Sequence, residues 1–254
     1  MLFETLPDMT TWIAAFAVGL LAGFIKGVVG FALPVIIVSG LGTFLTPELA
    51  LAGVILPALF TNIWQGLRQG FREAWDSLWK FRILVAVGLV VIVLSAQLVP
   101  VLPQNALYIA LGVPIALFAA TSLAGWVPRL KRRRTLAEVL TGIVGGIFGG
   151  LSGMFGPPLI LFLTAIDTPK TEQVRVTGVV FIAGSFVYVF AHLLSGILTP
   201  STAIFSALLT IPAIVGLALG FLLQDRIDQA TFRRVTLFIL LIAGMNLIRR
   251  GVMG

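Results

Sequence analysis

Long apolar runs follow one another from end to end of this 254-residue chain, and they constrain its fold more than any other feature. Only 11% of the residues are charged, against about 25% in a soluble domain, so the chain lacks the polar groups to cover a surface that faces water. Outer-membrane strands would alternate in ~10-residue segments, and these runs do not alternate. The sequence therefore predicts an all-α polytopic membrane protein. The ten runs cover residues 12–29, 31–45, 49–66, 83–99, 104–126, 136–154, 157–166, 174–198, 201–223 and 232–249.

Two of these runs, 31–45 and 157–166, are short for a full membrane span. Each follows a glycine-rich break and opens near proline, at Pro34 and at Pro157–Pro158. Proline suits the first turn of a helix, where its missing N–H group is not needed. We therefore expect about eight long transmembrane helices plus two short ones, which are either broken half-helices or re-entrant arms.

The glycine-rich break occurs twice, at residues 23–34 and 149–158, with one offset of 126 residues between the two copies. Paired broken helices in two halves of a membrane chain indicate the binding site of a transporter. Glycines four residues apart also let two helices pack closely, which is the alternative role for any one of them. Repetition with proline at corresponding ends favours a binding role for Gly27, Gly30, Gly153 and Gly156.

Basic residues gather in three stretches between the runs: 68–82, 129–134 and 226–234. The positive-inside rule places these loops in the cytoplasm, and the two halves then cross the membrane in opposite directions. This predicts an inverted-topology repeat, although Arg249 and Arg250 fall outside against the rule. The predicted parts are a first transmembrane repeat at 1–126, a basic cytoplasmic linker at 127–135 and a second, inverted repeat at 136–254.

Lys26 is the only charged residue between Asp8 and Glu48. A buried ammonium costs about 2.5–3.5 kcal/mol on insertion scales, so a functional role is the default. The alternative is that the side chain snorkels to the cytoplasmic interface. If the helix N-termini after both breaks meet near the midplane, they would attract an anion there. Ser152, a neutral donor, holds the position of Lys26 in the second break.

Further polar residues lie inside apolar runs. Asn62 and Gln65 are one helical turn apart and could bind substrate oxygens or join helices. His192, the only histidine, follows Tyr188 by one turn and suits either proton coupling or a structural hydrogen bond. Arg175 could guard the cytoplasmic mouth or set the orientation. The complete set of candidate substrate-binding residues is Lys26, Gly27, Gly30, Phe31, Asn62, Gln65, Ser152, Gly153, Phe155, Gly156, Tyr188 and His192.

Several function classes lack their signatures. The chain has no cysteine, no Walker-type phosphate loop and no H-E-x-x-H pair, so we expect no metal, no cofactor and no enzyme activity. The net charge of +7 comes from loops between spans and does not indicate a nucleic-acid partner. The expected partners are a small anionic substrate and the lipid bilayer, with a coupling proton and a homodimer left open.

The two glycine-rich motifs, the basic central linker and the two-half layout resemble the TauE/SafE family of sulfite and organosulfonate exporters. The resemblance implies a multi-pass carrier in the bacterial inner membrane that exports small sulfur-containing anions. Three alternatives stay open: an anion channel, which could use the same helix ends, an intramembrane enzyme, and a non-transporting assembly subunit.

Overall fold

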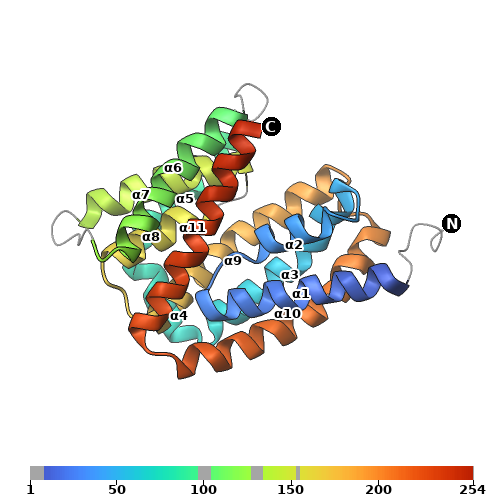
Figure 1. Ribbon diagram of the computed structural model, residues 1–254, viewed down its shortest axis with the longest axis horizontal. Helices are drawn as coiled ribbons and strands as arrows, with labels where there is room; N and C mark the ends of the chain where they lie inside the picture. The colour runs from blue at the N-terminus through green and yellow to red at the C-terminus, as the bar shows by residue number, and fades with distance from the viewer. Residues whose placement is uncertain (1–8, 97–103, 127–133, 153–154, 254) are drawn as a thin grey trace. The chain divides into compact units, whose positions relative to one another are not determined.

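The computed structural model describes residues 9–96, 104–126, 134–152 and 155–253, and these parts of the chain form eleven α-helices and no strand (Figure 1). The predicted all-helical class is therefore confirmed. The helices are α1 Met9–Val29, α2 Leu33–Leu41, α3 Pro47–Leu67, α4 Phe71–Lys80, α5 Arg82–Ala96, α6 Gln104–Leu123, α7 Arg134–Ser152, α8 Gly156–Ala165, α9 Lys170–Leu194, α10 Pro200–Arg226 and α11 Gln229–Met253.

Five helices within the described ranges are long and apolar enough to cross a membrane: α1, α3, α9, α10 and α11. A sixth span results if α4 and α5, which meet at a bend of 76°, are taken together. The expected number of about eight is not confirmed. The described apolar parts of α6 and α7, Gly112–Leu123 and Thr135–Ile147, are shorter than the ~20 residues that a span needs at about 1.5 Å per residue.

The two short runs do form short helices, as predicted. Helix α2 has nine residues and α8 has ten, and each carries proline at its first or second position. Both N-cap residues, Ala32 and Phe155, lack a side-chain hydrogen bond to the first turn. The first N–H groups of both helices are therefore left without a side-chain cap, which is the feature that makes a helix N-terminus attractive to an anion.

The basic stretch 68–82 was expected as a loop, and this was wrong for most of its length, because residues 71–80 form helix α4. The missed signal is the spacing of Phe71, Trp75 and Trp79, four residues apart, with charged residues between them. That spacing places the aromatic rings on one helical face and most of the charges on another.

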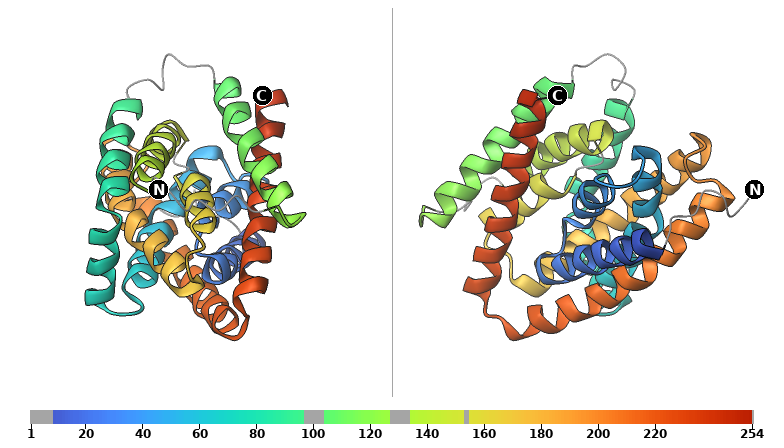
Figure 2. Two further views of the ribbon diagram at one scale, coloured as in Figure 1. Left: turned by 90° about the vertical axis from the view of Figure 1, so that its left-hand side faces the viewer. Right: turned by 45° about the vertical axis from the view of Figure 1, so that its right-hand side comes forward.

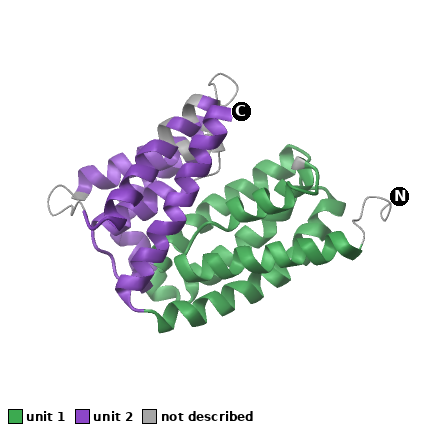
Figure 3. Cartoon of the chain, viewed as in Figure 1, with its two compact units in different colours: residues 1–74, 174–227 green, residues 75–173, 228–254 purple. Residues whose placement is uncertain are grey.

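The described chain divides into two compact units (Figure 3). Unit 1 contains residues 1–74 and 174–227, and unit 2 contains residues 75–173 and 228–254. Each unit thus combines helices from the two halves of the chain. The repeat boundaries predicted above describe the order of elements along the sequence rather than these units, and they stay a prediction.

Unit 1 is built on the pairing of α1 with α10, which lie side by side in all views (Figures 1 and 2). A Cβ atom added to Gly23 would lie 2.0 Å from the carbonyl oxygen of Ala213, and one on Gly27 would lie 2.4 Å from that of Leu217. Conversely, a Cβ atom on Gly216 would lie 2.0 Å from Leu20 O. Small residues allow this close approach of two backbones. Helix α2 packs against α1 and α3 and adds Leu33, Ile37 and Leu41 to the buried core.

In unit 2, two helix pairs also approach closely at glycine residues. Helix α5 packs along α7, where a Cβ atom on Gly146 would lie 2.6 Å from Val91 Cβ and 2.9 Å from Gly88 O. Helix α6 packs along α11, where a Cβ atom on Gly112 would lie 2.8 Å from Gly244 O. Glycine at these contacts sets the distance between paired helices in both units.

Candidate functional site

The ammonium group of Lys26 is buried inside unit 1. The residue lies in the last turn of α1 and is only 1% exposed. Its Nζ atom donates hydrogen bonds to Thr61 Oγ1, at 2.8 Å, and to Asn62 Oδ1, both on α3. The side chain therefore turns into the protein and does not snorkel to an exposed surface. The sequence prediction placed Lys26 and Asn62 in one site, and the structure brings these two residues into direct contact.

The amide of Asn62 continues this network to a third helix. Its Nδ2 atom donates to Ser185 Oγ at 2.6 Å and to Phe181 O at 3.4 Å, both on α9. The hydroxyl of Thr61, which accepts from Lys26, donates to Pro57 O at 2.5 Å. Sequence reasoning missed Thr61 and Ser185. Thr61 could have been found as the polar neighbour of Asn62, whereas hydroxyl residues are too common in apolar runs for Ser185 to be distinguished.

Gln65, one turn beyond Asn62, fixes the broken helix in place. Its Nε2 atom donates to Gly30 O at 2.9 Å and to Val174 O at 2.7 Å. The side chain is 1% exposed, and its Oε1 atom is buried without a hydrogen-bond partner. A buried acceptor without a donor costs about 1–3 kcal/mol. Such a group within a polar network suggests that a donor arrives from a ligand or a water molecule.

The break itself reverses the chain within a few residues. Gly30 has φ 87°, and Ala32, the N-cap of α2, has φ 78°. The N–H of Gly30 donates to Lys26 O at 2.6 Å, so α1 ends where Lys26 enters the site. Left-handed backbone costs a residue with a side chain roughly 1–2 kcal/mol, so Ala32 is held there by its surroundings. Phe31, another predicted site residue, is buried between them.

The electrostatics of this cluster are unbalanced. Among the described residues, no carboxylate forms an ion pair with Lys26, and its hydrogen-bond partners are a hydroxyl and an amide oxygen. The C-terminal end of α1 carries partial negative charge, which favours a cation by about 0.3–2 kcal/mol. The described residues thus provide no full countercharge, and of the three N–H donors of an ammonium two are used here. The arrangement can therefore receive an anion.

Tyr188 and His192 lie further along α9. Their rings meet edge to face with centroids 4.3 Å apart, and His192 Nδ1 is 3.5 Å from Ser195 Oγ. Because Ser185, Tyr188 and His192 are three and then four residues apart, they share one face of α9. The structure thus places the predicted pair on the helix face that also carries the Ser185 end of the Lys26 network. Their role in binding or proton coupling stays a prediction.

Arg175 and Gly27 have clear structural contacts. Arg175 Nη1 donates to Gln69 Oε1, which joins the start of α9 to the segment after α3. Gly27 faces α10, with Gly220 Cα 2.8 Å from the position of an added Cβ atom. This is the packing role that the sequence left as the alternative, and a gating or binding role for either residue stays a prediction.

The residues of the second break belong to unit 2. Gly156 opens α8, and the ring of Phe155 fills the contact between α5 and α7, 2.8 Å from an added Cβ on Gly88 and 3.0 Å from one on Gly145. Ser152 is the last residue of α7, and Gly153 lies outside the described residues. That these residues share a substrate with Lys26 stays a prediction.

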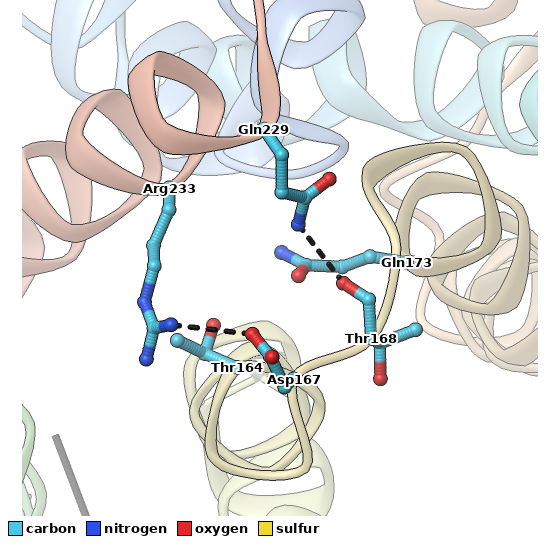
Figure 4. A pocket seen from close by; sticks show the side chains of 6 residues that line it. All are labelled: Thr164, Asp167, Thr168, Gln173, Gln229 and Arg233. Carbon is cyan, nitrogen blue, oxygen red and sulfur yellow. Dashed lines mark hydrogen bonds and ion pairs between the residues drawn. The ribbon is translucent and has the colours of Figure 1, made fainter.

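Unit 2 also contains a small cavity of about 10 Å³, room for about one water molecule (Figure 4). Arg233 Nη1 lies 3.3 Å from Asp167 Oδ1, while Gln229 donates to Thr168 O at 3.2 Å and accepts from Lys170 N at 2.8 Å. These contacts hold the turn after α8 against the first turns of α11, which the sequence did not predict. The cavity is lined by Thr164, Asp167, Thr168, Gln173, Gln229 and Arg233.

The described residues contain no group of three or more histidine, cysteine, aspartate or glutamate side chains that could hold a metal ion. No curated protein and no solved structure with which the chain was compared matches it. One family model does match, that of the sulfite exporter TauE/SafE family, and it covers residues 15–247. With nearly the whole chain matched and with five membrane-length apolar helices in its described parts, the protein belongs to the sulfite exporter TauE/SafE family of membrane transporters.

Proposed function

We propose that this protein is a secondary transporter that exports a small sulfur-containing anion, such as sulfite or an organosulfonate, across the bacterial inner membrane. The observation that carries the proposal is the buried ammonium of Lys26, which has neutral hydrogen-bond partners and lies at the break between α1 and α2. Membership of the family supports the substrate class. The direction of transport follows the family description as well.

The Lys26 cluster offers an anion three kinds of contact. The ammonium supplies charge, and the uncapped first turn of α2 supplies backbone N–H groups and partial positive charge. The unpaired Oε1 of Gln65 can accept a hydrogen bond from a protonated anion or from a substrate amine. Sulfite carries a proton near neutral pH in part of its population, and taurine carries an ammonium group, so both offer such a donor. Gln65 would then contribute to the choice among sulfur anions.

Alternating access would come from an inverted repeat, which the positions of the helices support. At the offset of 126 residues, α1 corresponds to α7, α2 to α8, α3 to α9, the pair α4 and α5 to α10, and α6 to α11. The packing corresponds too, since α1 pairs with α10 in unit 1 and α7 pairs with α5 in unit 2. The chemistry does not repeat, because the positions of Lys26 and Asn62 hold Ser152 and Tyr188 in the second half. Substrate contacts would then be stronger in the first half.

The direct test is binding and flux with purified protein. Thermal unfolding in detergent is measured with sulfite, sulfate, thiosulfate, sulfoacetate and taurine, and with acetate as the carboxylate control. A ligand that binds the folded state raises its stability by mass action. Counterflow of labelled sulfite into sulfite-loaded vesicles then shows whether a carrier cycle operates. Unitary conductance without counterflow would instead indicate an anion channel.

Lys26→Met keeps the length of the side chain and removes its charge. Loss of a charge-assisted hydrogen bond, worth about 1.5–3 kcal/mol, should weaken anion binding by about tenfold to a hundredfold. The ligand-free variant should have a stability close to that of the original protein, because removal of a buried charge offsets the loss of the donor to Asn62 Oδ1. Lys80→Met is the matched control, since Lys80 is an exposed lysine that pairs with Glu172. Equal anion affinity in both variants would remove Lys26 from the substrate site.

A further inference from the structure

Helix α4 divides its surface into three sectors. Phe71, Trp75 and Trp79 form an aromatic stripe whose side chains are 74%, 54% and 60% exposed. Ala74 and Ser77 are buried, and they lie in a separate sector of the helix. The charged residues of the helix occupy the remaining sector beside the stripe: Arg72, Glu73, Asp76 and Lys80. One face of this ten-residue helix therefore packs on protein, one is charged, and one exposes large aromatic rings.

The exposed stripe is too apolar for a face in water and too short for a membrane span. Ten residues extend about 15 Å, half of the hydrocarbon thickness. Tryptophan is enriched where hydrocarbon meets the headgroups, since its ring has an apolar body and a polar N–H. Helices with an apolar aromatic face next to a charged face lie along that interface. The stripe has this composition.

The direction of α4 agrees with such a position. Its axis is bent 76° from that of α5, with the break at Phe81. Transmembrane helices tilt on average about 20° from the membrane normal, so with α5 entering the bilayer at such a tilt, α4 lies nearer the membrane plane than the normal. The exposed side chains Val90, Val93 and Leu94 give α5 a lipid-type surface of its own. The aromatic stripe thus adjoins an apolar helix with large exposed hydrophobic side chains.

Charge at the two ends of α4 fits a lipid surface. Residues 68–82 contain four basic and two acidic side chains. Lys80 pairs with Glu172 of α9, and the Arg82 guanidinium stacks on Trp79 at 5.1 Å from the ring centroid. Arg72 is exposed in the first turn of α4. A basic group at this depth is attracted to anionic headgroups of the cytoplasmic leaflet.

We propose that α4 is an in-plane interfacial helix, with Phe71, Trp75 and Trp79 inserted at the boundary between lipid headgroups and acyl chains. The lipid bilayer itself covers the aromatic stripe. The charged sector faces the aqueous phase, and the buried sector holds the helix on the protein. The Lys80–Glu172 pair fixes this membrane-bound helix to the first turn of α9.

The absence of cysteine from the sequence allows a direct test in the full-length protein. Single-cysteine variants Phe71→Cys, Trp75→Cys and Trp79→Cys report on the stripe, Asp76→Cys on the charged sector and Ala74→Cys on the buried one. Each is labelled with a nitroxide and placed in nanodiscs of phosphatidylcholine and phosphatidylglycerol. Electron paramagnetic resonance then compares collisions with oxygen, which enters lipid, and with a water-soluble nickel chelate.

The proposal expects three different results from the three sectors. Stripe labels should collide several-fold more with oxygen than with nickel and should share one shallow depth, whereas the Asp76→Cys label should favour nickel. The Ala74→Cys label should be shielded from both, and its spectrum should be immobilised. Nickel access at all exposed positions would overturn the proposal. A helix that runs along the membrane normal would also overturn it, because labels at 71 and 79 would then differ in depth by about 12 Å.

A second copy of the chain or another protein on the stripe gives other signals. Dipolar broadening that disappears on dilution with unlabelled protein would place the stripe at a dimer contact and contradict the lipid assignment. Misfolding of a stripe variant is recognised by its elution in size-exclusion chromatography and by its loss of helical circular dichroism. In that case Trp75 and Trp79 are followed in a variant whose other three tryptophans, Trp12, Trp64 and Trp126, are replaced by phenylalanine, by quenching with lipids labelled at shallow or deep acyl positions. Quenching by deep labels alone, or by neither, contradicts the proposal.

Discussion

The glycine contact between α1 and α10 makes a quantitative prediction, because two glycines of one helix differ sharply in the space around them. A Cβ atom on Gly23 would lie 2.0 Å from Ala213 O, whereas one on Gly19 would lie 3.4 Å from the side chain of Pro212 and 3.5 Å from Leu209. The same change, glycine to alanine, therefore produces a severe backbone clash at one position and ordinary van der Waals contact four residues away.

The expected magnitude follows from this geometry. To restore an ordinary contact, α1 and α10 must separate by about 1.4 Å at Gly23, and overpacking of this kind costs about 1–3 kcal/mol. Neither the Ala213 carbonyl nor the α1 backbone can rotate away as a flexible side chain would. At Gly19 no separation is required, and alanine is favoured over glycine in a helix interior by up to about 1 kcal/mol. Gly23→Ala should therefore be destabilised, and Gly19→Ala should be neutral or stabilised.

The measurement is reversible unfolding of both variants in mixed micelles with increasing denaturing detergent, followed by intrinsic tryptophan fluorescence. Gly184→Ala is a further control, because no atom lies within 4 Å of an added Cβ atom there, so it reports helix propensity alone. We expect Gly23→Ala to be less stable than Gly19→Ala by at least about 1 kcal/mol. Equal stability of the two variants would refute the close backbone contact between α1 and α10.

Two shorter predictions concern polar contacts. Gln65→Leu should destabilise the protein by about 1–3 kcal/mol, because the carbonyls of Gly30 and Val174 lose their donor. A variant that unfolds like the original protein would contradict a stabilising role for these two hydrogen bonds. Hydrogen bonds from the side chain and backbone of Thr231 lower the pKa of Asp228. A lowered folded-state pKa means that this contribution to stability is complete above about pH 4 and is lost as the pH falls through the folded-state pKa. Asp228→Asn should remove that part of the acid sensitivity, and an unchanged pH profile of thermal unfolding would argue against it.

The sequence predicted much of the local structure, for physical reasons that act over short distances. Apolar composition alone excludes a water-facing fold, and helices are the way in which such runs satisfy their backbone groups in lipid. The short helices α2 and α8 were predicted from Pro34 and Pro157, because proline fits the first turn and the preceding glycines end the helix before it. Helix α4 was not predicted, because the charges of residues 68–82 are typical of a cytoplasmic loop as well as of one face of a helix.

The candidate site was predicted in part. Lys26, Asn62 and Gln65 were selected as polar residues that are expensive in an apolar run, and that energetic argument needs no tertiary information. Their partners Ser185 and Val174 were not selected, since a serine can bond to its own helix and a backbone carbonyl carries no signal in the sequence. The carbonyl oxygens of Phe181 and Pro57, which accept hydrogen bonds from Asn62 and Thr61, likewise carry no signal in the sequence.

What the sequence determined by itself is the class of the protein, the positions of its helix breaks and the one charge that needed a partner. Which helices pair was decided only by the tertiary structure. Periodicity shows that Gly19, Gly23 and Gly27 share a face, but it does not show that α10 covers that face or that only Gly23 and Gly27 lack room for a Cβ atom. Contacts such as that between Lys26 and Asn62, 36 residues apart, depend on how whole helices pack. Packing is a property of complementary surfaces, and a single segment of sequence describes only one of them.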